Sequence, residues 1–464
     1  MAILFDDALP TLINILLTWG GSDFVEKGTV LRDASGRLSF FAATRPLTAE
    51  SARAIHPLDG EQPHESEEDE LDALGRLIVN TLGAYARTDR PVVYPTEGGD
   101  APMVTSSERL PIRIGEQFCY VVDRRIVGSG WLADPAPPAS TTPRIVFASL
   151  KGGVGRSTAM TVAAADLARR GKNVLVIDLD LEAPGVGHLL LDGDRLPDYG
   201  ALDFLVEDGV GGIAHSLLPH FVGTSQLTSS EGGVVDVLPA IGRKSESAPE
   251  NILAKLARAM IEDVTDTGIV SVGEQISSMI DRIAALRSYD AVLIDSRAGL
   301  AELAAPAVIG LGATVLLFGT AQRQSIEGYR ALFAALQLLA QRDLAQERNA
   351  EWRLALRPVY AKSSMKIETS ERFREEIYEL YSEYIYDAEP DAGDGTQIDS
   401  LRYLKKDPSA PHTPLVIPFN PAFVDFDPAR APDQLTTAFY EQSFRPFLDG
   451  IDRILAPDSL ENQN

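Results

Sequence analysis

The chain has 464 residues, of which 45% are hydrophobic and 23% charged, which is the composition of a globular protein with room for about three domains. Its formal net charge of −25 argues against partners that are themselves anionic, so we expect neither nucleic acid nor a membrane surface as a partner. A single cysteine excludes an internal disulfide framework, and no window approaches the ~20 apolar residues of a membrane helix, so we expect a soluble cytoplasmic protein.

Residues 1–132 predict a small α+β domain. A helix is expected near residues 9–19, and a hairpin follows in which a turn at 34–36 joins two short apolar segments. Residues 71–87 carry apolar side chains at helical spacing, and residues 111–132 predict two further strands around turns. The acidic segment 60–72 is interpreted as a solvated loop or helix entry or, alternatively, as an acidic docking peptide.

Residues 133–143, ADPAPPASTTP, predict a linker because Pro, Ala, Ser and Thr dominate and nothing in it can pack a core. A second domain is expected over 144–455, with a tail at 456–464. Its apolar runs do not alternate with polar residues, and helical segments separate them, which predicts a mostly parallel sheet covered by helices on both faces. The expected strands are 145–150, 173–180, 234–240, 289–299, 313–321, 353–363 and 414–420.

The second domain is organised around a glycine-rich turn. Residues 145–150 are expected to form a strand, 151–155 the turn, and 156–171 a helix. Glycines let backbone N–H groups approach a polyphosphate, and the helix N-terminus adds unpaired donors and partial positive charge. Asp178, Asp180 and Asp295 fall at the carboxyl ends of two of these expected strands, where ligands of such sheets bind.

The segments KGGVGRST at 151–158, DLDLEAPG at 178–185 and DSRAG at 295–299 resemble the deviant Walker A ATPases of the ParA/MinD family. The resemblance covers about residues 144–455, and it leaves residues 1–132 as an unrecognised module. It implies a P-loop NTPase fold with ATP and Mg²⁺ as cofactors, and a homodimer that forms when nucleotide binds.

The resemblance also implies roles for individual residues. Lys151 matches the lysine that reaches the phosphates, often across a dimer interface, and Asp180 the acid that positions the attacking water, so these two are the expected catalytic residues. Magnesium is expected at Ser157, Asp178 and Asp295, partly through water. Nucleotide contacts are implied for Lys151, Gly152, Gly153, Val154, Gly155, Arg156, Ser157, Thr158 and Gly299. Adenine contacts are expected from residues 360–362 or 418–421.

Two positions depart from the family pattern. Arg156 replaces the usual second lysine of the loop, and Arg297 stands where proline is usual. Arginine keeps the charge but is planar and forked, so nucleotide binding remains expected while hydrolysis is left open. We hypothesise that Glu182 pairs with Arg156 or Arg297 in one nucleotide state; an ordinary solvated glutamate is the alternative.

Three functions follow from these patterns. The first is an ATP-binding switch that dimerises, hydrolyses ATP slowly with Mg²⁺ and regulates a protein partner through residues 1–132. The second is a regulatory module that holds nucleotide without hydrolysing it. The third is a DNA-associated partitioning or positioning ATPase, which the net charge of −25 disfavours.

Overall fold

A computed structural model of the chain describes residues 3–44, 67–95, 103–139, 142–226, 232–265, 268–364, 366–387 and 401–456, with the backbone alone for 67–72. Most of the predicted acidic segment 60–72 lies outside these ranges. The chain divides into two compact units. Unit 1 comprises Met1–Leu132 and Gln337–Ala350, and unit 2 comprises Ala133–Leu336 and Glu351–Asn464. Each unit is described by itself.

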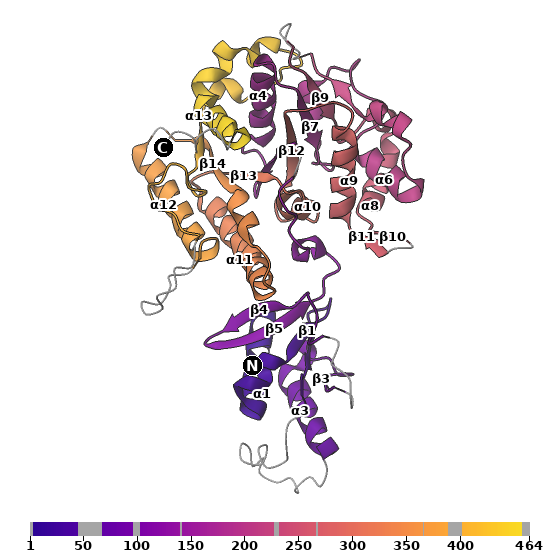
Figure 1. Cartoon of the computed structure of the whole chain (residues 1–464), viewed down its shortest axis with the longest axis vertical. Coiled ribbons are helices and arrows are strands. Elements are labelled where there is room, and N and C mark those ends of the chain that lie inside the picture. The colour runs from indigo at the N-terminus through magenta and orange to yellow at the C-terminus, as the bar shows by residue number, and fades with distance from the viewer. Residues whose placement is uncertain are drawn as a thin grey trace. The chain divides into compact units, whose positions relative to one another are not determined.

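Within residues 1–132 of unit 1, a five-stranded sheet packs against two helices (Figure 1). The helices are α1 (Phe5–Lys27) and α3 (Glu67–Leu82), and the sheet order is β3-β2-β1-β5-β4. Its strands are β1 (Thr29–Arg32), β2 (Leu38–Phe41), β3 (Val92–Val93), β4 (Leu110–Ile114) and β5 (Gln117–Asp123).

The hairpin predicted in unit 1 is confirmed, because β1 and β2 pair antiparallel across the turn after Arg32. Strand β5 then pairs parallel to β1. Strand residues such as Phe40 and Cys119 are buried against the apolar face of α1, so the lone cysteine is a core residue, as expected.

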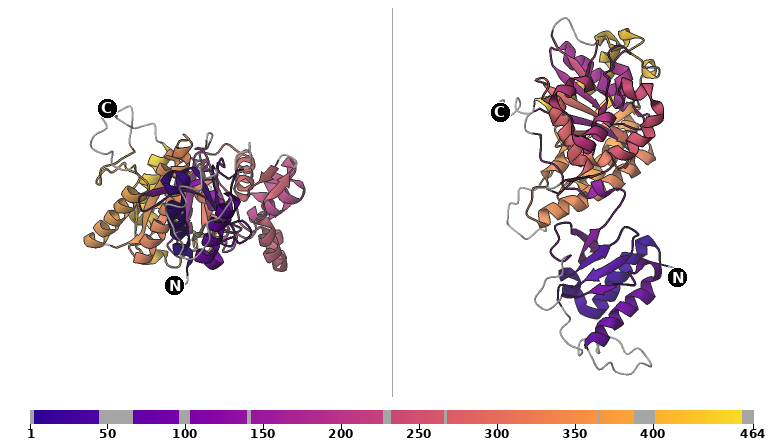
Figure 2. Two further views of the ribbon diagram at one scale, coloured as in Figure 1. Left: turned by 90° about the horizontal axis from the view of Figure 1, so that it is seen from below. Right: turned by 90° about the vertical axis from the view of Figure 1, so that its right-hand side faces the viewer.

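Unit 2 contains a sheet with helices packed around it (Figure 2). The sheet has eight strands in the order β15-β14-β13-β6-β12-β7-β9-β8. All neighbouring pairs are parallel except β8 and β9, which pair antiparallel at one edge. The strands are β6 (Arg144–Ser149), β7 (Val174–Asp178), β8 (Gly223–Thr224), β9 (Val235–Leu238), β12 (Ala291–Ala298), β13 (Thr314–Gly319), β14 (Leu356–Ser363) and β15 (Leu415–Pro418). The predicted parallel sheet is therefore confirmed.

Helices cover both faces of this sheet. One face packs on α4 (Arg156–Arg169), α5 (Val186–Leu190) and α13 (Thr437–Leu455). On the other side are α9 (Val272–Ala284), α10 (Ala304–Ile309), the first part of α11 (Arg323–Ala345) and α12 (Ile367–Tyr384). The shorter elements α6 (Ala201–Gly211), α7 (Arg243–Ser247) and α8 (Ile252–Ala259), with the hairpin β10 (Asp263–Thr265) and β11 (Gly268–Val270), complete the unit.

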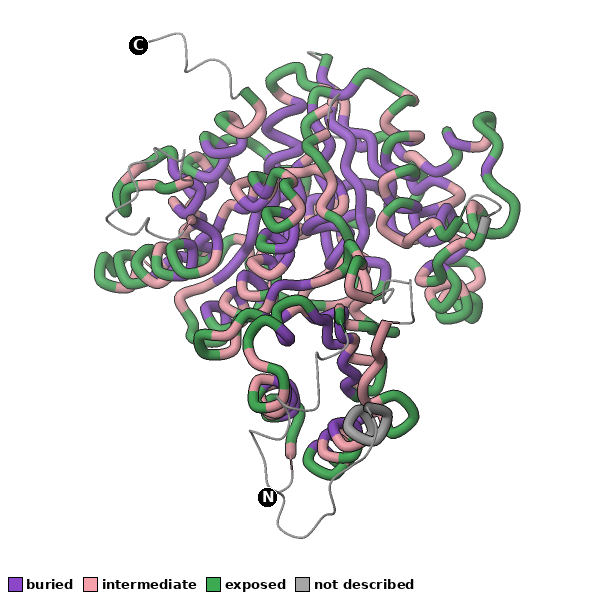
Figure 3. The backbone as a smooth tube through the Cα atoms, turned by 60° about the horizontal axis from the view of Figure 1, so that its bottom comes forward, coloured by how far each residue is buried: buried purple, intermediate pink, exposed green. Residues whose placement is uncertain are grey.

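The central strands are buried on both faces, which explains their unbroken apolar sequences (Figure 3). In β12, for example, Val292, Leu293 and Ile294 are all at most 1% exposed although they point alternately to opposite faces. Within the part of the chain that the structure describes, no helix is long and apolar enough to cross a membrane.

Part of the predicted linker is held against unit 2. The backbone N–H of Ala136 donates to the carbonyl of Ile309 at 2.8 Å, and that of Ala139 donates to the carbonyl of Gly312 at 2.9 Å. The segment thus satisfies its backbone by pairing with the loop between α10 and β13, although it contributes little to a core.

Helix α13 is fastened to the sheet by a cluster of phenylalanines. The Phe447 ring lies 6.3 Å from that of Phe147 on β6 and 6.0 Å from that of Phe318 on β13, and it is fully buried.

Phe447→Ala should therefore lower the free energy of unfolding by about 3–5 kcal/mol, measured by chemical denaturation. Phe439→Ala, on the same helix but only partly buried, is the control and should cost clearly less; equal losses would contradict this packing.

Candidate phosphate-binding site

The glycine-rich turn joins β6 to α4 at the carboxyl edge of the sheet. Gly153 and Gly155 have φ values of 74° and 93°, a left-handed conformation that other residues adopt only with strain. A Cβ atom built on Gly152, Gly153 or Gly155 would meet nothing within 4 Å. The space over the loop is therefore open, as a phosphate cradle requires.

Arg156 is the first residue of α4. Its guanidinium is buried against carboxylates. Its Nη2 lies 3.1 Å from Asp180 Oδ2, its Nε lies 3.0 Å from Asp295 Oδ1, and its Nη1 donates to Ser149 Oγ at 3.1 Å. The side chain is only 9% exposed. Because the guanidinium is forked, one residue can bind both acids and a hydroxyl at once.

The expected magnesium ligands are also bonded to protein groups. Ser157 Oγ donates to Asp295 Oδ2 at 2.6 Å. Asp178 accepts three backbone N–H bonds, from Asp180 to Oδ1 and from Gly185 and Val186 to Oδ2, at 3.0–3.1 Å. Asp178 therefore holds the following loop in place.

Burial perturbs two of these acids. It raises the pKa of Asp178 to about 7, with the charge of Asp295 adding to the effect and the backbone N–H bonds opposing it. Burial likewise raises the pKa of Asp295 to about 6, although Arg156 and Ser157 favour the ionised form. Ionising these buried carboxylates is therefore unfavourable, and a bound cation would stabilise their charged forms.

Other predicted residues lie at the loop without pointing into it. Lys151 Nζ donates to Gln322 Oε1 of the same chain at 3.0 Å. The backbone N–H of Gly299 donates to the carbonyl of Ser149 at 2.8 Å. Val154 is 5% exposed and belongs to the core, and both Val154 and Thr158 line the cavity described next.

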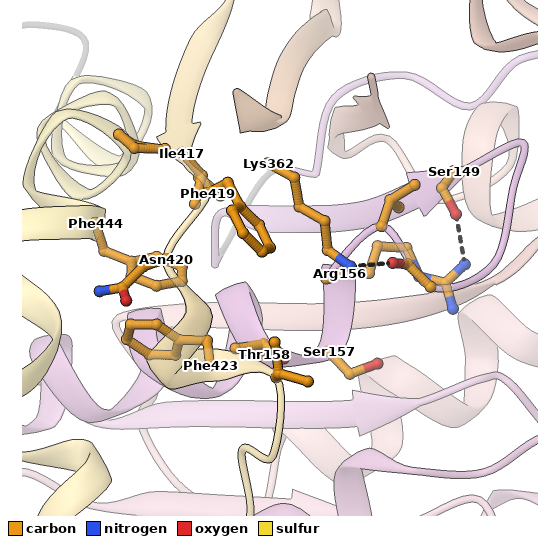
Figure 4. Close-up of a pocket in the computed structure, with 15 residues that line it drawn as sticks. Ser149, Arg156, Ser157, Thr158, Lys362, Ile417, Phe419, Asn420, Phe423 and Phe444 are labelled. Carbon is orange, nitrogen blue, oxygen red and sulfur yellow. Dashed lines mark hydrogen bonds between the residues drawn. The ribbon is translucent and has the colours of Figure 1, made fainter. Parts of the chain in front are cut away.

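A cavity of about 410 Å³ opens beside the loop (Figure 4). The loop and the start of α4 form one end, through Gly153 to Thr158, with Ser149 next to them. The other end is largely apolar, and its residues are Ile417, Pro418, Phe419, Asn420, Phe423, Val424 and Phe444. Lys362, from the end of β14, also lines the cavity.

The two segments expected to contact adenine contribute unequally to this cavity. Lys362, Pro418, Phe419 and Asn420 line it, but Tyr360 is 2% exposed and stacks on Phe373 of α12. Sequence reasoning missed Phe423 and Val424 as lining residues. A signal existed, because PFNPAFVDF at 418–426 is aromatic-rich and directly follows a strand at the ligand-binding edge.

The hypothesis that Glu182 forms an ion pair holds in this structure. Its partner is Arg297, while Arg156 is bonded to Asp180 and Asp295. Glu182 lies in the loop after β7 and Arg297 near the end of β12, so the pair joins these two segments. Both side chains are partly exposed, at 43% and 29%.

The residues present fit a magnesium ion. Ser157, Asp295 and Asp178 offer the oxygen donors that Mg²⁺ prefers, and Asp180 Oδ1 is buried with no hydrogen-bond partner among the described residues. In that part of the chain no group of three or more His, Cys, Asp or Glu side chains could hold a metal by itself. An ion here would therefore take part of its coordination from phosphate oxygens and water, as Mg²⁺ usually does.

A strand, a glycine-rich loop and a helix N-terminus at the carboxyl edge of a parallel sheet define a P-loop nucleotide-binding domain. The sequence comparison carries the assignment further, because residues 145–341 match the family described as the CobQ/CobB/MinD/ParA nucleotide binding domain. This part of the chain is a domain of that family. No curated protein gave a significant match.

Solved structures give weaker likenesses. The MinD cell division protein of Aquifex aeolicus is 19% identical with a TM-score of 0.39, covering 67% of this chain and 97% of that one. Cobyrinic acid a,c-diamide synthase of Mycobacterium smegmatis, with a bound ATP analogue and magnesium, is 19% identical with a TM-score of 0.35, covering 54% and 86%. The pNOB8 ParA bound to nonspecific DNA is 15% identical with a TM-score of 0.40, covering 68% and 100%.

The buried position of Arg156 predicts a large effect of its removal. Arg156→Met leaves Asp180 and Asp295 buried without their cation, which should cost about 3–5 kcal/mol of unfolding free energy without nucleotide. Arg297→Met breaks only the partly exposed pair with Glu182 and should cost about 0–1 kcal/mol. Denaturation midpoints of the two variants test the difference, and similar losses would show that the Arg156 network is not the stronger constraint.

The raised acid pKa values predict a pH dependence with a definite sign. Because the folded pKa of Asp178 exceeds its ordinary value, the folded chain binds more protons than the unfolded chain between about pH 4 and 7. The contribution of Asp178 to stability is therefore greatest below this window and falls as the pH rises through it.

Asp178→Asn cannot ionise, so the stability of the wild type relative to this variant should decrease from pH 5 to pH 8 in denaturation series. Asp194→Asn, at an exposed position, is the control and should show no such trend. A wild-type advantage that stays constant or grows with pH would contradict the raised pKa.

Proposed function

We propose that the chain is an ATP-binding molecular switch that hydrolyses ATP slowly with Mg²⁺, dimerises in the nucleotide-bound state and regulates a protein partner through residues 1–132. The observation that carries the proposal is the cavity, which runs from the glycine-rich loop to a group of aromatic side chains. Its two ends match the two ends of a nucleotide, which are a charged polyphosphate and a flat base.

Each end supplies the contacts its part of the ligand needs. The loop from Gly152 to Thr158 offers backbone N–H groups and the N-terminus of α4 to the phosphates. Phe419 and Phe423 offer apolar surface on which a base can stack. Ser157 and Asp295 would hold Mg²⁺, with Asp178 close by. When bound, the ion would neutralise charge that develops on the phosphates.

Asp180 is the residue that would position the attacking water. It is 8% exposed, and its Oδ1 has no hydrogen-bond partner among the described residues, so it can accept a proton from a water molecule. Arg156 donates to the other oxygen and so fixes the orientation of the carboxylate.

The same contact favours a second function, a module that holds ATP without hydrolysing it. If Arg156 remains on Asp180 when ATP binds, the carboxylate stays neutralised and restrained, and turnover is lost. The two functions differ in one measurement, which is phosphate release over hours by protein that binds ATP.

DNA-associated positioning is the third function that the sequence suggested. The net charge of −25 weighs against it, because attraction to DNA phosphates requires positive charge. ATP-dependent, salt-sensitive retardation of random DNA by the protein would support it instead.

For the proposed switch, wild-type protein should release phosphate from ATP in the presence of Mg²⁺. Asp180→Ala should reduce the rate by about 10²-fold or more, because positioned proton acceptors contribute 10²–10⁴-fold. Binding of ATP should persist in this variant. Asp194→Ala, an exposed acid in the same unit, is the control and should keep the wild-type rate.

Equal rates in wild type and Asp180→Ala would sink the hydrolysis proposal. Tight ATP binding without phosphate release would establish the non-hydrolysing module. Mass measurement with ATP, with ADP and without nucleotide tests dimerisation, and Lys151→Ala should abolish an ATP-induced dimer if Lys151 contacts the partner's nucleotide. In this structure Lys151 is bonded to Gln322, so dimerisation would require that bond to break.

A further inference from the structure

Lys362 has an unusual backbone. Its φ is 50°, and only Glu347 shares a positive φ among the non-glycine residues that the structure describes. The position lies within an irregularity of β14, where the pairing with β15 shifts register between Tyr360 and Ser363. A glycine would adopt this conformation without strain, whereas the Cβ of a lysine comes too close to the backbone. Strained residues of this kind cluster at functional sites.

The strained backbone aims the side chain of Lys362 at the phosphate loop. Its Nζ donates to the carbonyl of Gly153 at 2.7 Å, across 209 residues of sequence. Figure 4 shows the side chain extending into the cavity beside the ring of Phe419. The lysine is exposed to the cavity, so its charge has not been desolvated.

The cations that line the cavity differ in whether a carboxylate already balances their charge. Of the 15 residues that line the cavity, Arg156 and Lys362 carry positive charge. The charge of Arg156 is already balanced by Asp180 and Asp295. No ion pair joins Lys362 to a carboxylate of the described residues, and its one hydrogen bond goes to a neutral carbonyl.

We propose that Lys362 is a phosphate-binding cation of this site, in addition to Lys151, and that it supplies from β14 the charge that Arg156 has committed to the buried acids. The proposal rests on the proposed nucleotide-binding function. When a nucleoside polyphosphate enters, Nζ exchanges the Gly153 carbonyl for a phosphate oxygen. A charge-assisted hydrogen bond then replaces a neutral one, and it is the stronger of the two.

The test compares the affinities of ATP and adenosine by calorimetry. Lys362→Met should weaken ATP binding by about 10- to 100-fold, the equivalent of 1.5–3 kcal/mol for a hydrogen bond to a charged group. Binding of adenosine should change less than about twofold, because the nucleoside has no phosphate. Lys362→Arg should restore part of the ATP affinity. Lys366→Met, an exposed lysine at the start of α12, is the control and should bind ATP like the wild type.

A second variant separates a binding role from a structural one. Lys362→Gly relieves the strained backbone, so its melting temperature should stay level or rise by about 1–2 °C while ATP affinity falls as in Lys362→Met. If Lys362 served only to hold the strand and loop together, the melting temperature would instead fall in both variants. That result would overturn the proposal.

The remaining outcomes are also decisive. ATP affinity that is equal in wild type and Lys362→Met overturns the role of Lys362 and leaves the nucleotide-binding function standing. Equal losses for ATP and adenosine overturn it as well, since they place the lysine at the base or in the fold. Absence of ATP binding by the wild type overturns the proposed function itself.

Discussion

The buried guanidinium of Arg156 is the contact on which the site depends. The parallel sheet brings the carboxyl ends of β7 and β12 to one edge, and the acids that follow these strands are removed from water there. Carboxylates buried together repel one another and resist ionisation. Arg156 joins Asp180 to Asp295 and, through Ser149, to the end of β6. The chain thus neutralises its own site before any ligand arrives.

This arrangement changes the usual balance of a phosphate site. An ammonium group on a flexible stem can turn toward a ligand, whereas a guanidinium bonded on several sides gives up those bonds if it moves. Arg156 therefore stabilises the protein, but it is poorly suited to move toward a ligand. Besides Lys151 of the loop, Lys362 on β14 is the cation that the geometry offers to a polyphosphate.

Most of the fold followed from the order of apolar runs, because strands such as β12 are buried on both faces and cannot alternate in polarity. The loop and the acids at strand ends followed from the same pattern. Short elements such as α6 and the hairpin β10–β11 were missed.

Side-chain partners could not be predicted, since they depend on where elements far apart in sequence meet. Nothing in the sequence near Lys362 indicates a left-handed residue aimed at Gly153, 209 positions away. The burial of Arg156 against Asp180 and Asp295 depends likewise on how β7 and β12 are placed beside α4.

An acid at a strand end can bind a metal ion or hold the loop that follows it, and Asp178 does the second in this structure. Its oxygens bind the backbone of Asp180, Gly185 and Val186, so it shapes the loop that carries both Asp180 and Glu182. Glu182 in turn pairs with Arg297 of β12. The loop is therefore fixed at one end by Asp178 and tied to β12 further along. Arg156 bonds Asp180 of this same loop, so Arg156, Asp178 and the Glu182–Arg297 pair all hold the loop in its place.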